Sequence, residues 1–510
     1  MIVGNEASLN QVTLGSGSTL QSTQMNVNGL VVSQAFGGAS GQAFRKGEHV
    51  DSLVLTGKTT ENDIALSYVV LNGEALDFSG SSSTNQAEHR ILLADGTISY
   101  DTDPANYELY IQSYTRARLE LSGGSLIIRG YRDEEGIKNE LTDTANRKLT
   151  LAALDETGGS GEAAWLKSYV GHVNRYTLAE RKQVLDAISG ASTAALADSQ
   201  RRGIQDLQSK LRNRIIQAGG GTNAGLTTDW EYVGLQAWAQ ADGSFSSSKG
   251  SGDECGYDYN AMGATVGANL DLSARTVAGL AFSASYGEID SDGADHARGN
   301  NDARYLSLFA RHQQNHCVHM LILSAGFNEM DLERSVSSYS ASGDTKGSSL
   351  SAYYETGYTI GLNYEYTHIL QPMVSISLTS AKVDSYTESG SLGNAALTYD
   401  GDNYLYGKIG LGARYQGVLY ETIHERNAVL ETRALVTRDF GDTTDTARVA
   451  LGGGTLHEIT GADTSGTGFE LGFGISIPVE QHTTLYADAD LSIAPDYTAL
   501  RANAGMRYDF

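Results

Sequence analysis

The final stretch of the chain, Ala499–Phe510, constrains the fold more than any other, because its residues alternate between two chemical characters. One parity of segment 497–510 is mainly apolar: Thr498, Leu500, Ala502, Ala504, Met506, Tyr508 and Phe510. The other parity is mainly polar: Tyr497, Ala499, Arg501, Asn503, Gly505, Arg507 and Asp509. Successive side chains of a β-strand point to opposite faces, so this period of two predicts a strand between an apolar and a polar environment.

Earlier stretches alternate in the same way, and the sequence predicts twelve such strands in all. They are residues 234–245, 258–271, 276–289, 302–313, 317–331, 350–363, 371–384, 403–416, 428–440, 467–480, 483–494 and 499–510. Strands of this length exceed the roughly 5–6 residues usual in globular proteins. They suit the ~9–11 tilted residues that cross a bilayer. We therefore predict an antiparallel transmembrane β-barrel, whose even strand number places both of its ends on one side.

The connections between these strands alternate in length. After even-numbered strands they are mostly short, as at 272–275, 314–316 and 481–482. After odd-numbered strands they are mostly long and polar: 246–257, 290–301, 332–349, 385–402 and 441–466. Outer-membrane barrels have short periplasmic turns and long external loops. This asymmetry favours a bacterial outer-membrane barrel over a soluble sandwich.

Composition fits a membrane barrel and excludes other classes. Charged residues make up 19 % of the chain, there are 28 tyrosines, and no run of about 18 apolar residues predicts a transmembrane helix. The net charge of −25 argues against nucleic acid as a partner. The first residues, MIVGNEASLNQ, lack the basic and apolar regions of a signal peptide. We expect the chain to be part of a longer exported protein, with the signal peptide upstream.

Residues 1 to about 155 are rich in Gly, Ser, Thr and Asn and contain short apolar segments, such as Val27–Val32 and Ile64–Leu71. Turn pairs such as Asn28-Gly29 separate these segments. The spacing predicts a β-helix-like segment, in which each coil buries its face by stacking on the next. A β-sandwich is the alternative.

A predicted helix follows the flexible segment 158–161 (GGSG). Its apolar stripe is Ile204, Leu207, Leu211 and Ile215, at helical spacing. The same segment carries five basic residues in an otherwise acidic chain: Arg201, Arg202, Lys210, Arg212 and Arg214. Taken alone, this pattern is typical of a surface helix with a solvated basic face.

Five motifs stand in a fixed order: Gln236–Gln240 (QAWAQ), Ser385–Gly390 (SYTESG), Thr437–Asp442 (TRDFGD), Leu485–Asp490 (LYADAD) before Asp496-Tyr497, and Ala504–Phe510 (AGMRYDF). In this order they resemble the translocator domain of type Va autotransporters, over residues from about 230 to 510. The resemblance implies that a helix at 191–218 threads the barrel. It divides the chain into a passenger remnant (1–157), a linker with the pore-spanning helix (158–222) and the translocator barrel (223–510).

A basic helix in a barrel lumen requires acidic partners, because an unpaired charge in a restricted space is costly. The lumen parity of the predicted strands carries five candidates: Glu355, Glu431, Glu470, Asp488 and Asp490. The predicted fold is therefore all-β: a twelve-stranded antiparallel transmembrane barrel with a lumenal helix, preceded by a β-helix-like passenger segment.

The resemblance also implies a function. The barrel would support secretion and surface display of its own passenger, and it would need no cofactor and catalyse no reaction itself. The passenger would be an adhesin under one interpretation. Its partners would be outer-membrane lipid, the barrel-assembly machinery, periplasmic chaperones and a host or surface ligand of the passenger; the barrel itself would be a monomer. Met506, Tyr508 and Phe510 would form the C-terminal assembly signal.

Other candidate sites in the sequence have ordinary structural explanations. The chain has no G-x-S-x-G motif for a serine hydrolase. His312, His316, Cys317 and His319 are metal-ligand types near a short turn, but ordinary interface histidines are the simpler interpretation. Asp290, Asp292 and Asp295 do not match a calcium loop. Cys255 and Cys317 lie at opposite predicted rims, which predicts no disulfide between them.

Some autotransporters cut the helix at an Asn-Asn junction, whereas here Asn213 is followed by Arg214. We therefore expect the passenger to stay attached or to be cut by another protease. Three alternatives remain open: a stand-alone porin or channel, a soluble all-β binding protein, and a surface-anchored enzyme encoded upstream.

Overall fold

The computed structural model describes the backbone of short strands before residue 78, and then residues 78–93, 97–100, 107–122, 125–157, 159–174, 176–217, 234–250, 254–273, 275–422, 426–463 and 466–510. The chain divides into two compact units, Met1–Leu185 and Asp186–Phe510. No helix in these ranges is long and apolar enough to cross a membrane.

The first unit begins with short strands that pair across long sequence separations. These strands are β1 (Ala7–Leu9), β2 (Val12–Leu14), β3 (Leu20–Gln21), β4 (Met25–Val27), β5 (Leu30–Val32), β6 (His49–Leu53), β7 (Leu55–Thr56), β8 (Asp63–Leu66), β9 (Val69–Gly73), β10 (Ala87–Leu93), β11 (Thr97–Tyr100) and β12 (Tyr107–Ile111). β2 pairs in parallel with β5, β5 with β9, and β9 with β12. Successive coils of a β-helix stack in this way. The β-helix-like segment remains a prediction with which these backbone pairings agree.

The first unit continues with an antiparallel hairpin and four helices. The hairpin joins β13 (Thr115–Ser122) to β14 (Ser125–Arg132). The helices are α1 (Glu134–Leu141), α2 (Ala145–Thr157), α3 (Gly161–Gly171) and α4 (Leu178–Ser189), the last of which extends into the second unit.

Helices therefore begin before residue 157, where the sequence predicted β-like structure to continue. α1 starts at a capping residue, because the Asp133 carboxylate accepts a hydrogen bond from the Gly136 amide at 3.2 Å. Its buried side chains, Ile137 and Leu141, are four residues apart on one helix face. α1 is only eight residues long and has two such positions, too few to reveal a helical period in the sequence.

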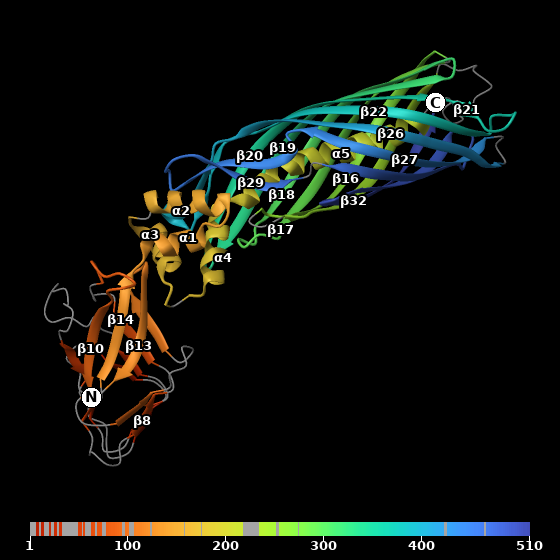
Figure 1. The fold of residues 1–510 in the computed structure, drawn as a ribbon. Coiled ribbons are helices and arrows are strands. Elements are labelled where there is room, and N and C mark those ends of the chain that lie inside the picture. The colour runs from red at the N-terminus through yellow and green to blue at the C-terminus, as the bar shows by residue number, and fades with distance from the viewer. Residues whose placement is uncertain are drawn as a thin grey trace. The chain divides into compact units, whose positions relative to one another are not determined.

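The second unit is a closed antiparallel barrel of twelve long strands with helix α5 (Ala194–Gln217) inside it (Figure 1). The strands are β15 (Leu235–Ser248), β16 (Tyr257–Ser273), β17 (Thr276–Ser291), β18 (Arg298–Gln314), β19 (Cys317–Val336), β20 (Tyr339–Tyr358), β22 (His368–Val383), β26 (Asp402–Glu421), β27 (Asn427–Gly441), β30 (Thr467–Pro478), β31 (Thr483–Ala494) and β32 (Tyr497–Asp509). β32 pairs with β15 over the whole length of β15 from Gln236 to Ser248, and this pairing closes the barrel. All twelve predicted strands overlap an observed one.

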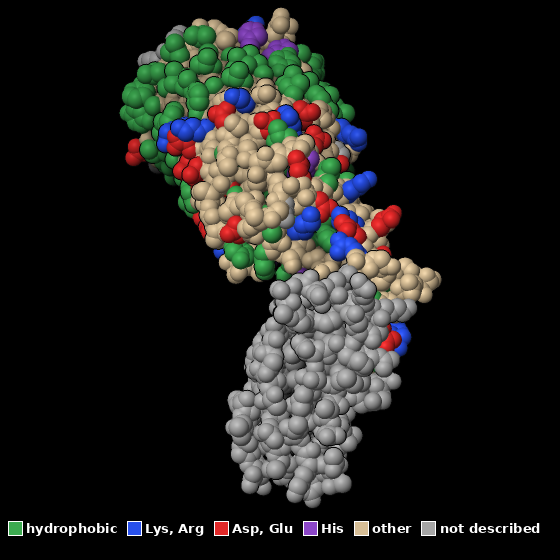
Figure 2. Space-filling view, turned by 90° about the vertical axis from the view of Figure 1, so that its left-hand side faces the viewer, with side chains coloured by type: hydrophobic (Ala, Val, Ile, Leu, Met, Phe, Trp, Pro, Cys, Tyr) green, Lys and Arg blue, Asp and Glu red, His purple; other side chains and the backbone are tan. Residues whose placement is uncertain are grey.

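The two faces of each strand have the predicted characters. Large apolar side chains on the outer face are exposed, as for Phe245 (64 %), Met262 (68 %) and Leu350 (67 %). Figure 2 shows hydrophobic side chains gathered over the barrel surface, here called the apolar band. On β32 the apolar parity, including Leu500 and Met506, points outward as predicted. A large apolar side chain left in water forgoes about 1.5–3 kcal/mol of burial, so this surface suits lipid.

The prediction of a loop at residues 332–349 is wrong. β19 and β20 continue through it and turn only at 337–338, with Val336 paired to Tyr339. Beyond the apolar band both faces of a strand can be polar, so alternation disappears while the backbone ladder continues. At the other end, the predicted strand 350–363 is interrupted: β20 ends at Tyr358 and the short β21 (Ile360–Gly361) follows.

The predicted loops 385–402 and 441–466 also contain regular structure. They contribute β23 (Tyr386–Thr387), β24 (Ser389–Gly390), the 3-10 helix η3 (Gly393–Ala395), β25 (Leu397–Tyr399), β28 (Thr444–Leu451) and β29 (His457–Asp463). β23, β25, β28 and β29 form a four-stranded antiparallel sheet, here called the external sheet. It lies at the long-loop end of the barrel, near the 3-10 helix η2 (Ala191–Thr193) that precedes α5.

Candidate functional site

Helix α5 packs its apolar stripe against one side of the lumen. Ile204, Leu207, Leu211 and Ile215 are at most 1 % exposed. Their buried partners come from β15, β17, β18, β19 and β20: Trp238, Ala281, Ala303, Tyr305, Phe309, Met320, Ile322 and Tyr353. We call these strands the apolar wall. The stripe predicted from sequence is therefore a packing surface inside the barrel, and the surface-helix alternative is excluded.

Gly203 allows this close approach. A Cβ at this position would lie 2.3 Å from the hydroxyl oxygen of Tyr305, well inside contact distance. Glycine costs a helix interior about 1 kcal/mol relative to alanine. Here its lack of a side chain lets the helix backbone lie against the apolar wall.

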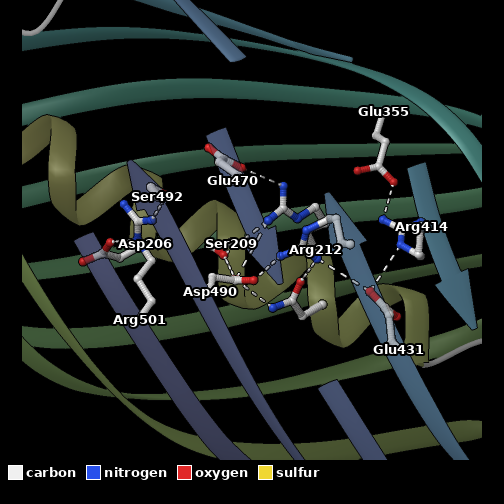
Figure 3. A network of polar contacts seen from close by, with 12 residues as sticks. Asp206, Ser209, Arg212, Glu355, Arg414, Glu431, Glu470, Asp490, Ser492 and Arg501 are labelled. Atoms are coloured by element: carbon white, nitrogen blue, oxygen red, sulfur yellow. Dashed lines mark hydrogen bonds and ion pairs between the residues drawn. The ribbon is translucent and has the colours of Figure 1, made fainter. Parts of the chain in front are cut away.

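The opposite face of α5 is polar and faces strands β22, β26, β27, β30, β31 and β32, here called the polar wall. The carboxylate of Asp206 forms an ion pair with Arg501 of β32 and also accepts a hydrogen bond at 2.6 Å from Ser244 of β15, at the border with the apolar wall. Arg212 lies 3.7 Å from Glu470 and 3.9 Å from Asp490. Figure 3 shows the contacts of Asp206 with Arg501 and of Arg212 with Glu470 and Asp490.

The acidic residues predicted for the lumen do lie inside the barrel, but basic residues of the wall neutralise most of them. Arg414 binds Glu355 at 2.6 Å and Glu431 at 3.2 Å (Figure 3). Arg433 binds Asp490, and Lys408 lies 3.2 Å from Glu470. Asp488 is also buried, on β31.

The five basic residues of the helix therefore have different environments. Arg201 and Arg202 both pair with Asp198 of the same helix. Lys210 pairs with Asp242 at 3.0 Å, a partner that the sequence prediction missed. Only Arg212, described above, reaches predicted acidic partners.

Arg214 makes no hydrogen bond or ion pair with any residue that the structure describes. Its guanidinium lies 5.3 Å from the ring centroid of Trp238 and 5.5 Å from that of Tyr486. Aromatic faces attract cations at such distances. This site could be anticipated only from Trp238, which the sequence placed in the first strand motif.

A polar space remains between α5 and the polar wall. Its volume is about 40 Å³, and it is lined by Gln205, Gln208, Ser209, Arg212, Tyr353, Ser375, Ser377, Lys408, Thr437, Glu470, Asp490, Ser492 and Arg501. A second space of about 10 Å³ shares Gln205, Ser377 and Lys408 with it. The helix is therefore held against one wall of the lumen and leaves only a small hydrophilic gap along the other.

The external sheet holds the segment that leads into α5. Arg334, at the long-loop end of β19, forms a bidentate ion pair with Glu388 at 2.6 and 2.8 Å. The same guanidinium donates to the carbonyl oxygen of Ala187 at 2.9 Å, in the last turn of α4. Both charged side chains are at most 1 % exposed. In the sequence, Glu388 belongs to the motif Ser385–Gly390, which does not indicate its partner.

The predicted assembly residues lie on the outer face at the other end. Met506, Tyr508 and Phe510 are 50 %, 44 % and 67 % exposed, and the rings of Tyr508 and Phe510 meet edge to face at 5.0 Å. The amide of Phe510 donates to the carbonyl oxygen of Leu235 at 3.0 Å, where the first and last strands meet.

Among the residues that the structure describes, no group of three or more His, Cys, Asp or Glu side chains could hold a metal ion. Cys255 and Cys317 are free thiols. His312 and His319 face each other on adjacent strands, on the outside of the barrel.

Residues 237–490 match the family model described as autotransporter beta-domain. Three solved structures are similar. They are the translocator domain of the autotransporter NalP from Neisseria meningitidis (18 % identity, 59 % of this chain and 96 % of that chain, TM-score 0.46), the beta domain of the Bordetella autotransporter BrkA (14 %, 54 % and 99 %, 0.41) and the transport unit of the autotransporter AIDA-I from Escherichia coli (14 %, 58 % and 97 %, 0.39). TM-scores below 0.5 do not establish a common fold, so the family rests on the match over 237–490. No curated protein matches the chain.

Proposed function

Residues 237–490 belong to the autotransporter beta-domain family, and on this basis we propose that the chain carries its own N-terminal segment to the bacterial surface and displays it there. An autotransporter beta-domain is an outer-membrane translocator barrel. The observation that supports display is α5, which runs inside a closed barrel and is continuous in sequence with the first unit.

In this proposal α5 is the plug of the pore after secretion. Its apolar stripe on the apolar wall and the ion pairs of Asp206, Lys210 and Arg212 favour retention over an open channel. The same contacts argue against a stand-alone porin, whose lumen would be free. The exposed apolar band argues against a soluble binding protein.

The displayed segment is residues 1–157, joined through 158–222 to the barrel at 223–510. We propose that it acts in adhesion, because stacked coils offer an extended contact surface. Its ligand would be a host or surface molecule. The Asn213 amide donates to Asp490 at 3.0 Å and accepts from Arg433 at 2.6 Å, which supports an intact, attached helix. We propose no catalytic role for the barrel domain itself.

Assembly would require outer-membrane lipid, periplasmic chaperones and the barrel-assembly machinery, which we propose reads Met506, Tyr508 and Phe510. The barrel would act as a monomer, since its sheet closes on itself and leaves no edge strand.

The test is surface display by cells that express the full chain behind a signal peptide, with an epitope tag at its start. Antibody should bind intact cells, and the unboiled protein should migrate differently from the boiled one on a gel. Deleting Phe510 should reduce both signals. A folded, heat-shifting barrel with no antibody binding on intact cells would refute display while leaving the barrel itself in place.

A further inference from the structure

Histidines collect at the short-turn end of the barrel, at the edge of the apolar band (Figure 2). His312 and His319 are cross-strand neighbours on β18 and β19. Their outward neighbours toward the membrane centre are Ala310 and Leu321. His368 begins β22, with Leu370 next on the same face. Each imidazole therefore stands where the lipid-facing surface meets the head-group region.

The three imidazoles use the same ring nitrogen for contacts within the barrel. The Nδ1 of His312 lies 2.9 Å from the hydroxyl of Thr276. The Nδ1 of His319 lies 2.9 Å from the Tyr354 hydroxyl, and that of His368 lies 2.8 Å from the Tyr415 hydroxyl. No Nε2 of the three makes a hydrogen bond to any residue in the described ranges.

A hydroxyl can donate to Nδ1 or accept from it, so these contacts are compatible with the tautomer that carries the ring proton on Nε2. In that tautomer Nδ1 accepts from the hydroxyl, and Nε2–H remains as a donor. At His319 the hydroxyls of Tyr354 and Thr356 both lie near Nδ1, whose single lone pair accepts from one of them.

We propose that His312, His319 and His368 bind the phosphate groups of phospholipids in the leaflet at the short-turn end, each through Nε2–H. Phospholipid is the ligand that the position selects, because the apolar band fixes the depth of the bilayer and phosphate oxygens are the acceptors at its border. The stacked tyrosines, with ring centroids 6.3 Å from His319 and 6.2 Å from His368, hold these imidazoles in orientation. The inference rests on the outer-membrane location and is independent of passenger display.

His482 provides a control at the same end. Its Nδ1 lies 2.9 Å from the carbonyl oxygen of Asp509, which can only accept, so the proton is on Nδ1. Its Nε2 is then an acceptor and should not bind phosphate, although its ring also meets a tyrosine, Tyr508, at 5.9 Å.

The experiment is solid-state NMR on the full chain with ¹⁵N-histidine, in vesicles of phosphatidylethanolamine and phosphatidylglycerol and in phosphate-free buffer. Lipid ³¹P should dephase the protonated Nε2 signals of His312, His319 and His368 but neither ring-nitrogen signal of His482. His→Phe variants assign the signals. Undiminished Nε2 signals for the three would overturn the proposal.

Two further arms separate a lipid site from alternatives. In maltoside micelles with inorganic phosphate, dephasing at the same nitrogens would indicate an adventitious ion only and would count against the lipid. The triple variant H312F/H319F/H368F should lower the thermal transition by about 2–4 °C more in the vesicles than in maltoside, where only the contacts within the barrel are lost. An equal loss in both media would indicate a structural role alone. Y415F should weaken dephasing at His368 and leave His312 unaffected, because only the first loses its hydroxyl donor.

Discussion

Asp206, near the middle of α5, forms an ion pair with Arg501 of the last strand, and the two side chains are only 15 % and 10 % exposed. The pair joins the helix to the strand that closes the barrel. Arg501 is also held by Ser492 at 2.9 Å and Tyr497 at 3.1 Å, so its position does not depend on Asp206 alone.

Removing this charge should loosen the helix. For Asp206→Asn we expect a loss of about 1–3 kcal/mol, because Arg501 would lose its buried carboxylate but keep two hydroxyl partners. The midpoint of the heat-dependent gel shift and single-channel recordings in planar bilayers measure stability and helix release. Asp290→Asn is the control, since the Asp290–Arg298 pair is 61 % and 78 % exposed and should contribute less than about 1 kcal/mol. Equal effects of the two variants would contradict the role of Asp206.

The apolar stripe should matter more than any one ion pair. Leu211 is fully buried against the apolar wall, so Leu211→Ala should cost about 2–5 kcal/mol and increase large-conductance openings. Leu350→Ala deletes the same atoms from an outward position that is 67 % exposed. In detergent it should change stability by no more than about 0.5 kcal/mol. If Leu211→Ala shows no increase in large-conductance openings, packing on the apolar wall does not retain the helix.

Breaking the pair between Arg334 and Glu388 should release the external sheet. Glu388→Gln leaves a fully buried guanidinium without its counter-ion, which costs about 3–5 kcal/mol. Trypsin should then cut after Arg448 of β28 much faster, as mass spectrometry of the fragments would reveal. Asp384→Asn, at the exposed pair with Lys382, should leave this cleavage rate as in the wild type. If trypsin cuts Glu388→Gln as slowly as Asp384→Asn, the predicted release of the external sheet is refuted.

Asp445 should make stability depend on pH. It lies in β28, and neither of its carboxylate oxygens has a hydrogen-bond partner among the described residues. Burial, followed by the nearby Asp198, raises the pKa of Asp445 well above its usual range, against the opposing effect of Arg201 and Arg202. A carboxyl group whose pKa is raised on folding destabilises the fold as pH rises above about 4, where the unfolded chain loses its proton.

Asp445→Asn should therefore be as stable as the wild type below about pH 4 and more stable at pH 8, by about 1–3 kcal/mol. Thermal midpoints across this range measure the difference. Asp302→Asn, at an exposed position of β18, should show no gain that grows with pH. A gain for Asp445→Asn that shrinks toward pH 8 would have the wrong sign and would exclude this explanation.

The barrel could be predicted from sequence because successive residues of a membrane-barrel strand face lipid and lumen in turn, so apolar and polar residues alternate. The same alternation predicts that Phe510 points outward and that Glu355, Glu431, Glu470 and Asp490 face the lumen. Glu355, Glu431 and Asp490 are buried, and Glu470 is 15 % exposed. The alternation weakens beyond the apolar band, which explains the missed extensions of β19 and β20 and the missed external sheet.

The pairing of charges in the lumen could not be predicted. Arg414 on β26 reaches Glu355 on β20, although β22 lies between these strands. Such contacts depend on strand stagger and on side-chain reach across the wall, which parity does not specify. The role of Asp206 was missed for another reason. It is one of few acidic residues in a mainly basic helix, so nothing in the sequence indicated that it would bind Arg501 in the lumen.

The position of α5 against the apolar wall also bears on the order in which the barrel is built. The apolar partners of the helix lie between Trp238 and Tyr353, the nearest part of the barrel in sequence, whereas Arg501 is 295 residues beyond Asp206. Contacts between near neighbours in sequence cost less chain entropy and form sooner. We therefore expect the first six strands to form a curved sheet around the helix before the last six complete the circle. The helix would then serve as a template for closure, and a chain without it should insert more slowly even where the finished barrel is equally stable.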